Sequence, residues 1–120
     1  MRDKNKIILI KIIEYCNDIE DAKSKYQIYS IEVLQDKFMK AMIGMFILQI
    51  GELAKQFTEE FIQGHTQIPW RSVKRMRDIY AHQYHMINTD YVWDTMNEDI
   101  PALKDFCVIT LRDEFSDNDE

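Results

Sequence analysis

Glycine, proline and cysteine are scarce in this chain of 120 residues, with three, two and two copies respectively. An all-β domain needs many tight turns, and glycine and proline build most of them, so this composition disfavours an all-β fold. The two cysteines, Cys16 and Cys107, lie far apart and form no Cys-x-x-Cys pair. We therefore expect buried, reduced thiols rather than a disulfide framework.

Long hydrophobic runs are also missing. The longest apolar stretch, residues 41–50, contains Gln49 and is about half as long as the ~20 residues that a membrane-spanning helix needs. Lys11 and Glu14 interrupt the first apolar stretch, which is not the pattern of a secretory signal. We expect a cytoplasmic protein with one domain over residues 1–112 and an acidic, solvated tail over 113–120.

The charge balance is acidic, with a formal net charge of −6. Such a balance argues against a general nucleic-acid binder, because neutralisation of phosphates dominates that kind of affinity. One local cluster runs the other way, since Arg71, Lys74, Arg75 and Arg77 fall within seven residues. The first three are candidates for contact with RNA around the fourth.

Apolar residues recur at steps of three and four along most of the chain, which is the helical period. The pattern predicts four helices, at about residues 4–23, 31–62, 70–84 and 89–110. Asp3, Ser30 and either Asn88 or Thr89 stand where N-caps belong, and Pro69 suits a first helical turn. Pro101 falls inside the last pattern, so we expect a kink or a break there. Short connections favour an all-α, antiparallel up-and-down bundle of four or five helices.

Residues 41–50 are apolar nearly all round the predicted helix. A helix of that kind must be covered on more than one side. A second copy of the chain is one source of that cover in a small domain, so the sequence favours a homodimer.

The run Arg77-Asp78-Ile79-Tyr80-Ala81-His82-Gln83-Tyr84 carries the chemistry. Arginine neutralises phosphate charge, and histidine moves protons near neutral pH. Arg77 and His82 are therefore candidate catalytic residues for cutting RNA without a metal. Asp78 lies four residues before His82 and shares its helix face, so it is a candidate to orient the imidazole. A metal site built on His82, His85 and Asp90 is not indicated, because no further ligand has helical spacing.

Arg77 and His82 do not share one face of a regular helix, because five residues turn the chain through ~140° between them. They can meet if the helix end unwinds, or if a symmetry mate supplies one of them. Glu52, amid apolar neighbours, either pairs with an arginine of that cleft or forms an ordinary structural ion pair.

This motif resembles the signature of HEPN-domain ribonuclease toxins of the HepT family. Ile50-Gly51-Glu52-Leu53-Ala54, Ile68-Pro69-Trp70-Arg71, Tyr91-Val92-Trp93 and Asp99-Ile100-Pro101-Ala102-Leu103 resemble further segments of that family, in order. The resemblance implies a HEPN helical bundle, a homodimer with its endoribonuclease site at the interface, and no cofactor. It also implies a toxin role and a minimal nucleotidyltransferase antitoxin as partner, which transfers AMP to the motif tyrosine, here Tyr84.

One position departs from the family pattern. The residue after the motif arginine is often asparagine, whereas this chain has Asp78. A carboxylate there either repels RNA or raises the basicity of His82, and the sequence leaves both open. The alternative function is a non-catalytic HEPN module that binds a nucleotidyltransferase, which the acidic charge favours and the intact arginine, histidine and tyrosine disfavour.

Overall fold

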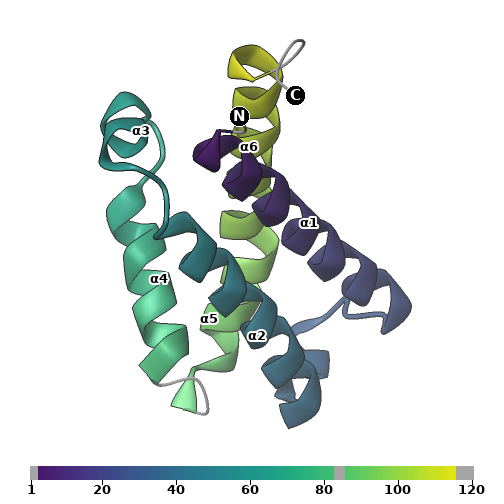
Figure 1. Cartoon of the computed structure of the whole chain (residues 1–120). Helices are drawn as coiled ribbons and strands as arrows, with labels where there is room; N and C mark the ends of the chain where they lie inside the picture. The colour runs from purple at the N-terminus through teal and green to yellow at the C-terminus, as the bar shows by residue number, and fades with distance from the viewer. Residues whose placement is uncertain (1–2, 83–85, 116–120) are drawn as a thin grey trace.

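The computed structural model describes residues 3–82 and 86–115, and these form helices joined by short turns (Figure 1). The elements are α1 (Lys4–Lys25), η1 (Ile31–Gln35), α2 (Lys37–Ala54), α3 (Glu59–Gly64), α4 (Trp70–His82), α5 (Thr89–Asp94), η3 (Thr95–Asp99) and α6 (Ile100–Glu114). No strand occurs in the described part of the chain. The four long helical segments run alternately in opposite directions, so the predicted all-α up-and-down bundle is confirmed.

The core lies between the long helices. Helix α2 packs against α1 on one side and against α4 on the other, and α1 packs against α6. The most fully buried large side chains include Leu9 and Ile12 of α1, Ile47 of α2, Tyr80 of α4 and Met96 of η3. Cys16 and Cys107 are buried free thiols, as the sequence predicts.

The prediction of one helix at about residues 31–62 is wrong in its extent, because this part of the chain forms three helices, η1, α2 and α3. Asp36 ends η1 and caps α2, accepting hydrogen bonds from the backbone N–H groups of Phe38 and Met39. Thr58 caps α3 in the same way by accepting from the N–H of Phe61. Each cap satisfies an N–H group that helical bonds leave free, so a new helix begins where the sequence pattern predicted continuity.

Three other local predictions are confirmed. The Asp3 carboxylate caps α1 by accepting from two backbone N–H groups. The Asn88 side chain caps α5, and α4 begins at Trp70, directly after Pro69. These features fix where α1, α4 and α5 begin, and the start of α4 sets where the motif lies along it.

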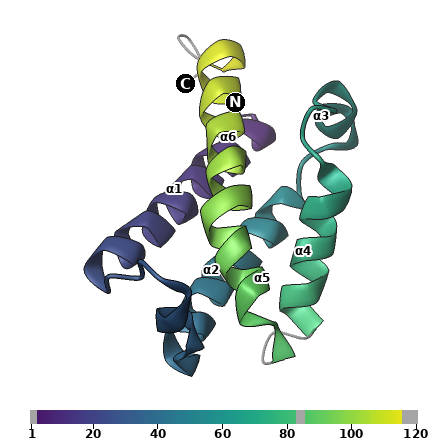
Figure 2. The ribbon, with the colours of Figure 1, turned by 180° about the vertical axis from the view of Figure 1, so that it is seen from behind.

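The break predicted near Pro101 takes the form of a π-helical turn. Figure 2 shows α5, η3 and α6 following one another as one helical column. Ile100 donates its N–H to the carbonyl of Thr95, five residues back, which is the π pattern. Pro101 has no N–H to give, so the widened turn lets the helix continue without that bond.

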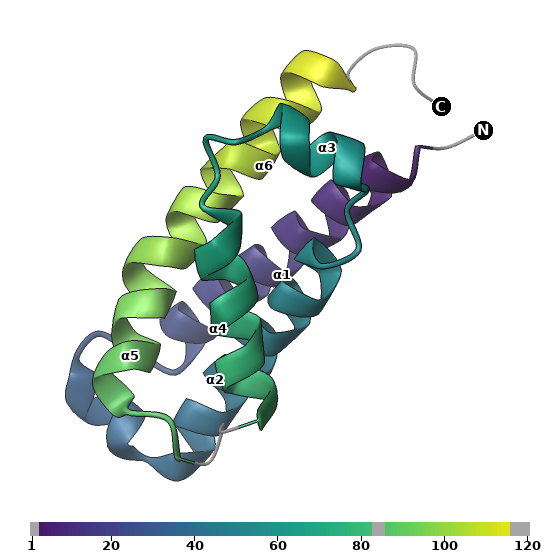
Figure 3. The ribbon, with the colours of Figure 1, turned by 90° about the vertical axis from the view of Figure 1, so that its left-hand side faces the viewer.

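Helix α3 is bonded to the start of α1 at one end and to the end of α6 at the other. Figure 3 shows it lying across the end of the molecule where α1 begins and α6 ends. At its start, Asn5 and Thr58 exchange two hydrogen bonds, both of 3.1 Å. At its end, the buried His65 contacts the Phe61 carbonyl through Nδ1 at 2.7 Å and the Glu114 carboxylate through Nε2 at 2.9 Å. These contacts hold α3 above the first turns of α4.

Candidate functional site

Helix α4 separates its side chains into an inner and an outer set. Met76 and Tyr80 are buried against the bundle, whereas Arg71, Lys74 and Arg75 are exposed. The amphipathic spacing of α4 therefore places the predicted RNA-binding side chains outward, where an anion in solution can reach them.

Arg77 lies between these two sets and faces α2. Its side chain is 20% exposed, and its Nη2 atom lies 2.8 Å from Oε2 of Glu52. The Nε atom also donates to Oε2 of Glu52, at 2.9 Å, so two nitrogens of the guanidinium contact the same carboxylate oxygen. The close approach is possible because Gly51 stands opposite, where an added Cβ would lie 2.6 Å from Cβ of Arg77.

The open choice for Glu52 is thereby resolved, since it pairs with the motif arginine itself. Sequence reasoning left this role undecided because the two residues are far apart in the chain. The signal was present in Gly51-Glu52, a glycine and a carboxylate at the end of an apolar helix.

Asp78 also pairs with Arg77, its Oδ1 atom accepting from Nη1 at 3.0 Å. The two carboxylates, Asp78 first and Glu52 second, raise the pKa of Arg77 above its ordinary value, so the guanidinium stays cationic. Among the described residues, no hydrogen bond joins Asp78 to His82. Within this single chain, Asp78 therefore does not orient the imidazole of His82 as predicted, and its carboxylate binds Arg77 instead.

His82 is the last residue of α4 and is exposed. The helix continues without interruption from Trp70 to His82, so its end does not unwind to bring His82 round to Arg77. One chain therefore presents Arg77 toward α2 and His82 on another side of the same helix.

Tyr84 and His85 lie outside the described residues, so the predicted modification site has no structural account. Just after them, Lys40 of α2 donates to the Ile87 carbonyl at 3.0 Å and fastens the chain to the bundle.

A groove of about 400 Å³ opens beside Arg77. It lies between the end of α2, helix α3 and the first two turns of α4, and its lining residues are Gly51, Ala54, Lys55, Ile62, Trp70, Val73, Lys74, Arg77 and Asp78. The contributions of Lys55, Ile62 and Trp70 were missed from the sequence. The spacing of Trp70, Val73, Lys74 and Arg77, at steps of three and four, is the signal that places them on one face of α4.

The described residues contain neither a cluster of metal ligands nor a membrane-spanning helix. Within residues 3–82 and 86–115, no three histidine, cysteine, aspartate or glutamate side chains gather as a metal site would require. In the same ranges, none of the helices combines the length and the apolar character that crossing a membrane demands.

Comparison with known proteins identifies the family. The model of the family described as "Ribonuclease HepT-like" matches residues 12–109. A protein named "Probable ribonuclease HepT" from Thermococcus cleftensis is 33% identical over 96 residues, which cover 76% of this chain and 87% of the relative. A protein named "Putative RNase MJ0127" from Methanocaldococcus jannaschii is 31% identical over 96 residues, covering 80% of this chain and 78% of the relative. No solved structure matches the chain significantly.

The family match spans α2 and α4 in full, and with them Gly51, Glu52, Arg77 and His82. The motif residues and the Gly51-Glu52 pair of the resemblance therefore lie on two helices that pack against each other. The chain belongs to the HepT-like ribonuclease family.

Proposed function

We propose that this protein is a metal-independent endoribonuclease whose active site forms between two copies of the chain. The observation that carries the proposal is the placement of Arg77 and His82. Both belong to α4, yet they point to different sides of it, so two copies are needed to bring one arginine and one histidine together. An isologous two-fold interface along α4 would create such a pairing twice.

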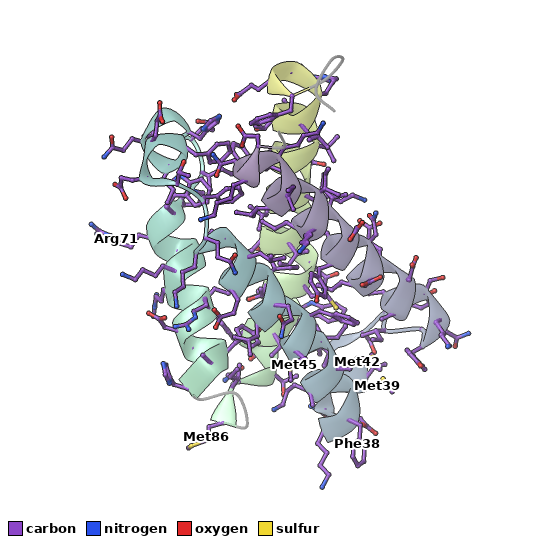
Figure 4. All side chains as sticks on the ribbon, viewed as in Figure 1. Phe38, Met39, Met42, Met45, Arg71 and Met86 are labelled. Atoms are coloured by element: carbon purple, nitrogen blue, oxygen red, sulfur yellow. The ribbon has the colours of Figure 1, made fainter. Side chains whose placement is uncertain are left out.

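The surface of α2 supports the second copy. Among the described residues, Phe38 is 71% exposed and Met45 is 47% exposed, and Met86, beyond the end of α4, is 81% exposed. Figure 4 shows Phe38, Met39, Met42 and Met45 along α2, with Met86 at the same end of the molecule. Large apolar side chains gathered in one region commonly mark an interface. The start of α2, where Phe38 lies, and the end of α4, where His82 lies, are at the same end of the bundle (Figure 1).

The reaction we propose is transfer within RNA. A base, for which His82 is the candidate, takes the proton of a ribose 2′-hydroxyl. The 2′-oxygen then bonds to the neighbouring phosphorus, the bond from phosphorus to the 5′-oxygen breaks, and an acid returns a proton to that oxygen. Arg77 stabilises the charge that develops on the phosphate oxygens. The products are a 2′,3′-cyclic phosphate and a free 5′-hydroxyl, and DNA is inert because it lacks the nucleophile.

The carboxylates around Arg77 have a defined part in this proposal. Glu52 and Asp78 hold the guanidinium in place, and Asp78, with a side chain that is 47% exposed, lies on the more open side. A phosphate that approaches Arg77 must displace or share the Asp78 contact. Arg71, Lys74 and Arg75 then supply further positive charge along the exposed face of α4.

Cleavage of a fluorescent RNA in the presence of EDTA tests the activity. We expect Arg77→Lys to lower the rate by about 100-fold or more, because lysine keeps the charge but loses the planar fork. His82→Ala should have an effect of similar size. Arg112→Lys is the matched control, since Arg112 also pairs with the aspartate that follows it, with Nε 2.8 Å from Oδ1 of Asp113, but on the exposed end of α6. Equal activity of all three variants and the wild type would refute the proposal.

We further propose that the protein is the toxin of a toxin–antitoxin pair and that a minimal nucleotidyltransferase silences it by transferring AMP to the hydroxyl of Tyr84. Tyr84 follows the exposed His82 by two residues. Adenylyl groups there would add bulk and negative charge where an anionic substrate must bind. The intact mass of the protein, expressed with and without the neighbouring transferase gene, tests this, with Tyr84→Phe as the variant and Tyr29→Phe, at a 66% exposed tyrosine, as the control.

A second candidate function is a non-catalytic module that binds a nucleotidyltransferase. The observation in its favour is that Arg77 is already engaged by two carboxylates, which compete with any phosphate. A purified protein that binds the transferase firmly but cuts no RNA, with Tyr84 unmodified, would favour this function over the ribonuclease.

A further inference from the structure

The groove beside Arg77 has the size of a ligand site. Its volume of about 400 Å³ lies within the range of roughly 300–1,000 Å³ that small-molecule pockets occupy. Residues from three helices line it, and α3, which forms one wall, is fixed at both ends by the Asn5–Thr58 and His65–Glu114 contacts. The groove is therefore held open by the fold rather than by one loop.

One side of the groove is apolar. Ile62, Trp70 and Val73 line it, and Gly51 and Ala54 opposite are small enough to leave space. The indole N–H of Trp70 already donates to the His65 carbonyl at 2.9 Å. Trp70 therefore offers the groove its carbon surface rather than a hydrogen bond. Such a surface binds the face of a flat group, whatever hydrogen-bonding groups that group carries at its edge.

The rest of the lining is mainly cationic. Lys55, Lys74 and Arg77 contribute three positive charges, and Asp78 contributes one negative charge. Arg77 is paired with Glu52 and Asp78, and Lys55 lies 4.0 Å from Glu52. Lys74 has no salt bridge to any carboxylate in the described part of the chain. On a protein with a net charge of −6, an unneutralised cation beside an apolar surface selects a ligand that is anionic at one end and apolar at the other.

We propose that this groove binds one unpaired nucleotide of the RNA substrate, with its base against Trp70 and Ile62 and its phosphate at Lys74 and Arg77. Bases of single strands expose the faces that aromatic and apolar side chains bind, whereas bases of a duplex stay stacked.

The position of the groove gives the subsite a direction. Along α4 it extends from Arg77 toward Trp70. Because Arg77 contacts the phosphate of the cleaved bond in the proposed reaction, the nucleotide in the groove lies next to that phosphate. This inference rests on the proposed ribonuclease function, and it predicts that cleavage requires at least one unpaired nucleotide on the groove side.

Binding of a short, fluorescein-labelled single-stranded RNA tests the subsite without cleavage if every ribose carries a 2′-O-methyl group. Lys74→Gln is compared with Arg71→Gln, because both side chains are exposed on α4 but only Lys74 lines the groove. Figure 4 shows Arg71 pointing away from the bundle. Ile62→Glu is compared with Ile109→Glu, which places the same charge at a 47% exposed isoleucine of α6.

We expect Ile62→Glu to weaken binding by about tenfold or more, as loss of a base contact commonly does, and Ile109→Glu to change it by less than about twofold. Lys74→Gln should weaken binding several times more than Arg71→Gln. Equal effects within each pair would overturn the subsite in favour of general surface electrostatics. If Ile62→Glu instead turns a dimer into a monomer by light scattering, a second copy occupies the groove and the proposal fails. Lys74→Gln, at an exposed position, keeps the test decisive if Ile62→Glu does not fold.

Cleavage of unmodified RNA by the same variants separates this proposal from the one on which it rests. If the wild-type protein cleaves RNA and the Ile62→Glu and Lys74→Gln variants cleave it equally fast, the subsite is refuted and the ribonuclease function stands. Groove-dependent binding by a wild-type protein that cuts no RNA would refute the ribonuclease function and leave a nucleotide-binding groove.

Discussion

Replacing Gly51 by alanine tests whether the contact between α2 and α4 sets the position of Arg77. A Cβ at residue 51 would meet Cβ of Arg77 at 2.6 Å and its Cα at 3.1 Å. Carbon atoms in contact prefer about 3.5–4.0 Å, so α4 would have to move outward by roughly 1 Å at this point. The atoms in the way belong to the backbone and the first side-chain carbon of Arg77, which cannot turn aside.

The size of the effect follows from two opposing terms. Overpacking of this kind costs about 1–3 kcal/mol, and alanine in place of glycine inside a helix returns up to about 1 kcal/mol. The expected net loss is about 1–2 kcal/mol, which lowers Tm by roughly 4–8 °C for a chain of this length. Cleavage should fall by more than this loss of stability explains, because a ~1 Å displacement of a catalytic group can cost about 100-fold in rate.

The other two glycines are the controls. At Gly64, an added Cβ meets nothing within 4 Å. At Gly44, an added Cβ lies 3.4 Å from Cε1 of Tyr80, close to an ordinary contact. Thermal unfolding followed by circular dichroism, together with RNA cleavage at 25 °C, should show Gly51→Ala alone to be impaired in both. A Gly51→Ala protein as stable and as active as Gly64→Ala would refute the close fit on which the placement of Arg77 depends.

Three further predictions concern single groups. Glu52 positions Arg77 through a contact of 2.8 Å, so Glu52→Gln should lower the cleavage rate constant with little change in KM or Tm. Glu52→Asp should restore part of the lost rate. An unchanged rate constant in initial-rate kinetics would show that this pairing is irrelevant to activity. Burial raises the pKa of the Cys16 and Cys107 thiols from 9.0 to about 12. Because the folded-state pKa is raised, the stabilisation is complete below the unfolded pKa and is lost as pH rises from about 9 to 12. Cys16→Ala should thus flatten the fall in Tm over that window, and a thiol reagent at pH 8 should react only after urea is added; rapid reaction of the native protein would contradict the burial. The buried Tyr80 hydroxyl has no hydrogen-bond partner among the described residues. Tyr80→Phe should therefore leave Tm unchanged or raise it by a few degrees, whereas a marked fall in calorimetry would show that the hydroxyl is satisfied.

The predictions from sequence succeed where one local rule decides the structure. Asp3 and Asn88 cap helices, and Pro69 precedes one, because side-chain oxygens and a fixed φ suit helix starts. The prediction of one helix over residues 31–62 fails because Phe57 and Phe61 continue the apolar period across a turn. Thr58 followed by Glu59 and Glu60 is the N-terminal signal that marks the break.

The candidate site divides in the same way. The motif residues Arg77, Asp78 and His82, and the outward cluster around them, could be named from the sequence because they are close together on one helix. The pairing of Arg77 with Glu52 and the groove under α3 could not. They depend on how closely α2 and α4 approach and on where α3 turns, and no local pattern specifies either of these.

Mixing two inactive variants tests most directly whether one chain supplies Arg77 and the other supplies His82. Two variants that are each expected to be inactive, Arg77→Lys and His82→Ala, are mixed, allowed to exchange subunits and assayed for RNA cleavage. In a mixed dimer, one of the two sites regains both native residues, so with random exchange the mixture should recover about a quarter of wild-type activity. Two inactive variants that recover nothing, although mass spectrometry shows mixed dimers, would contradict a site shared between chains.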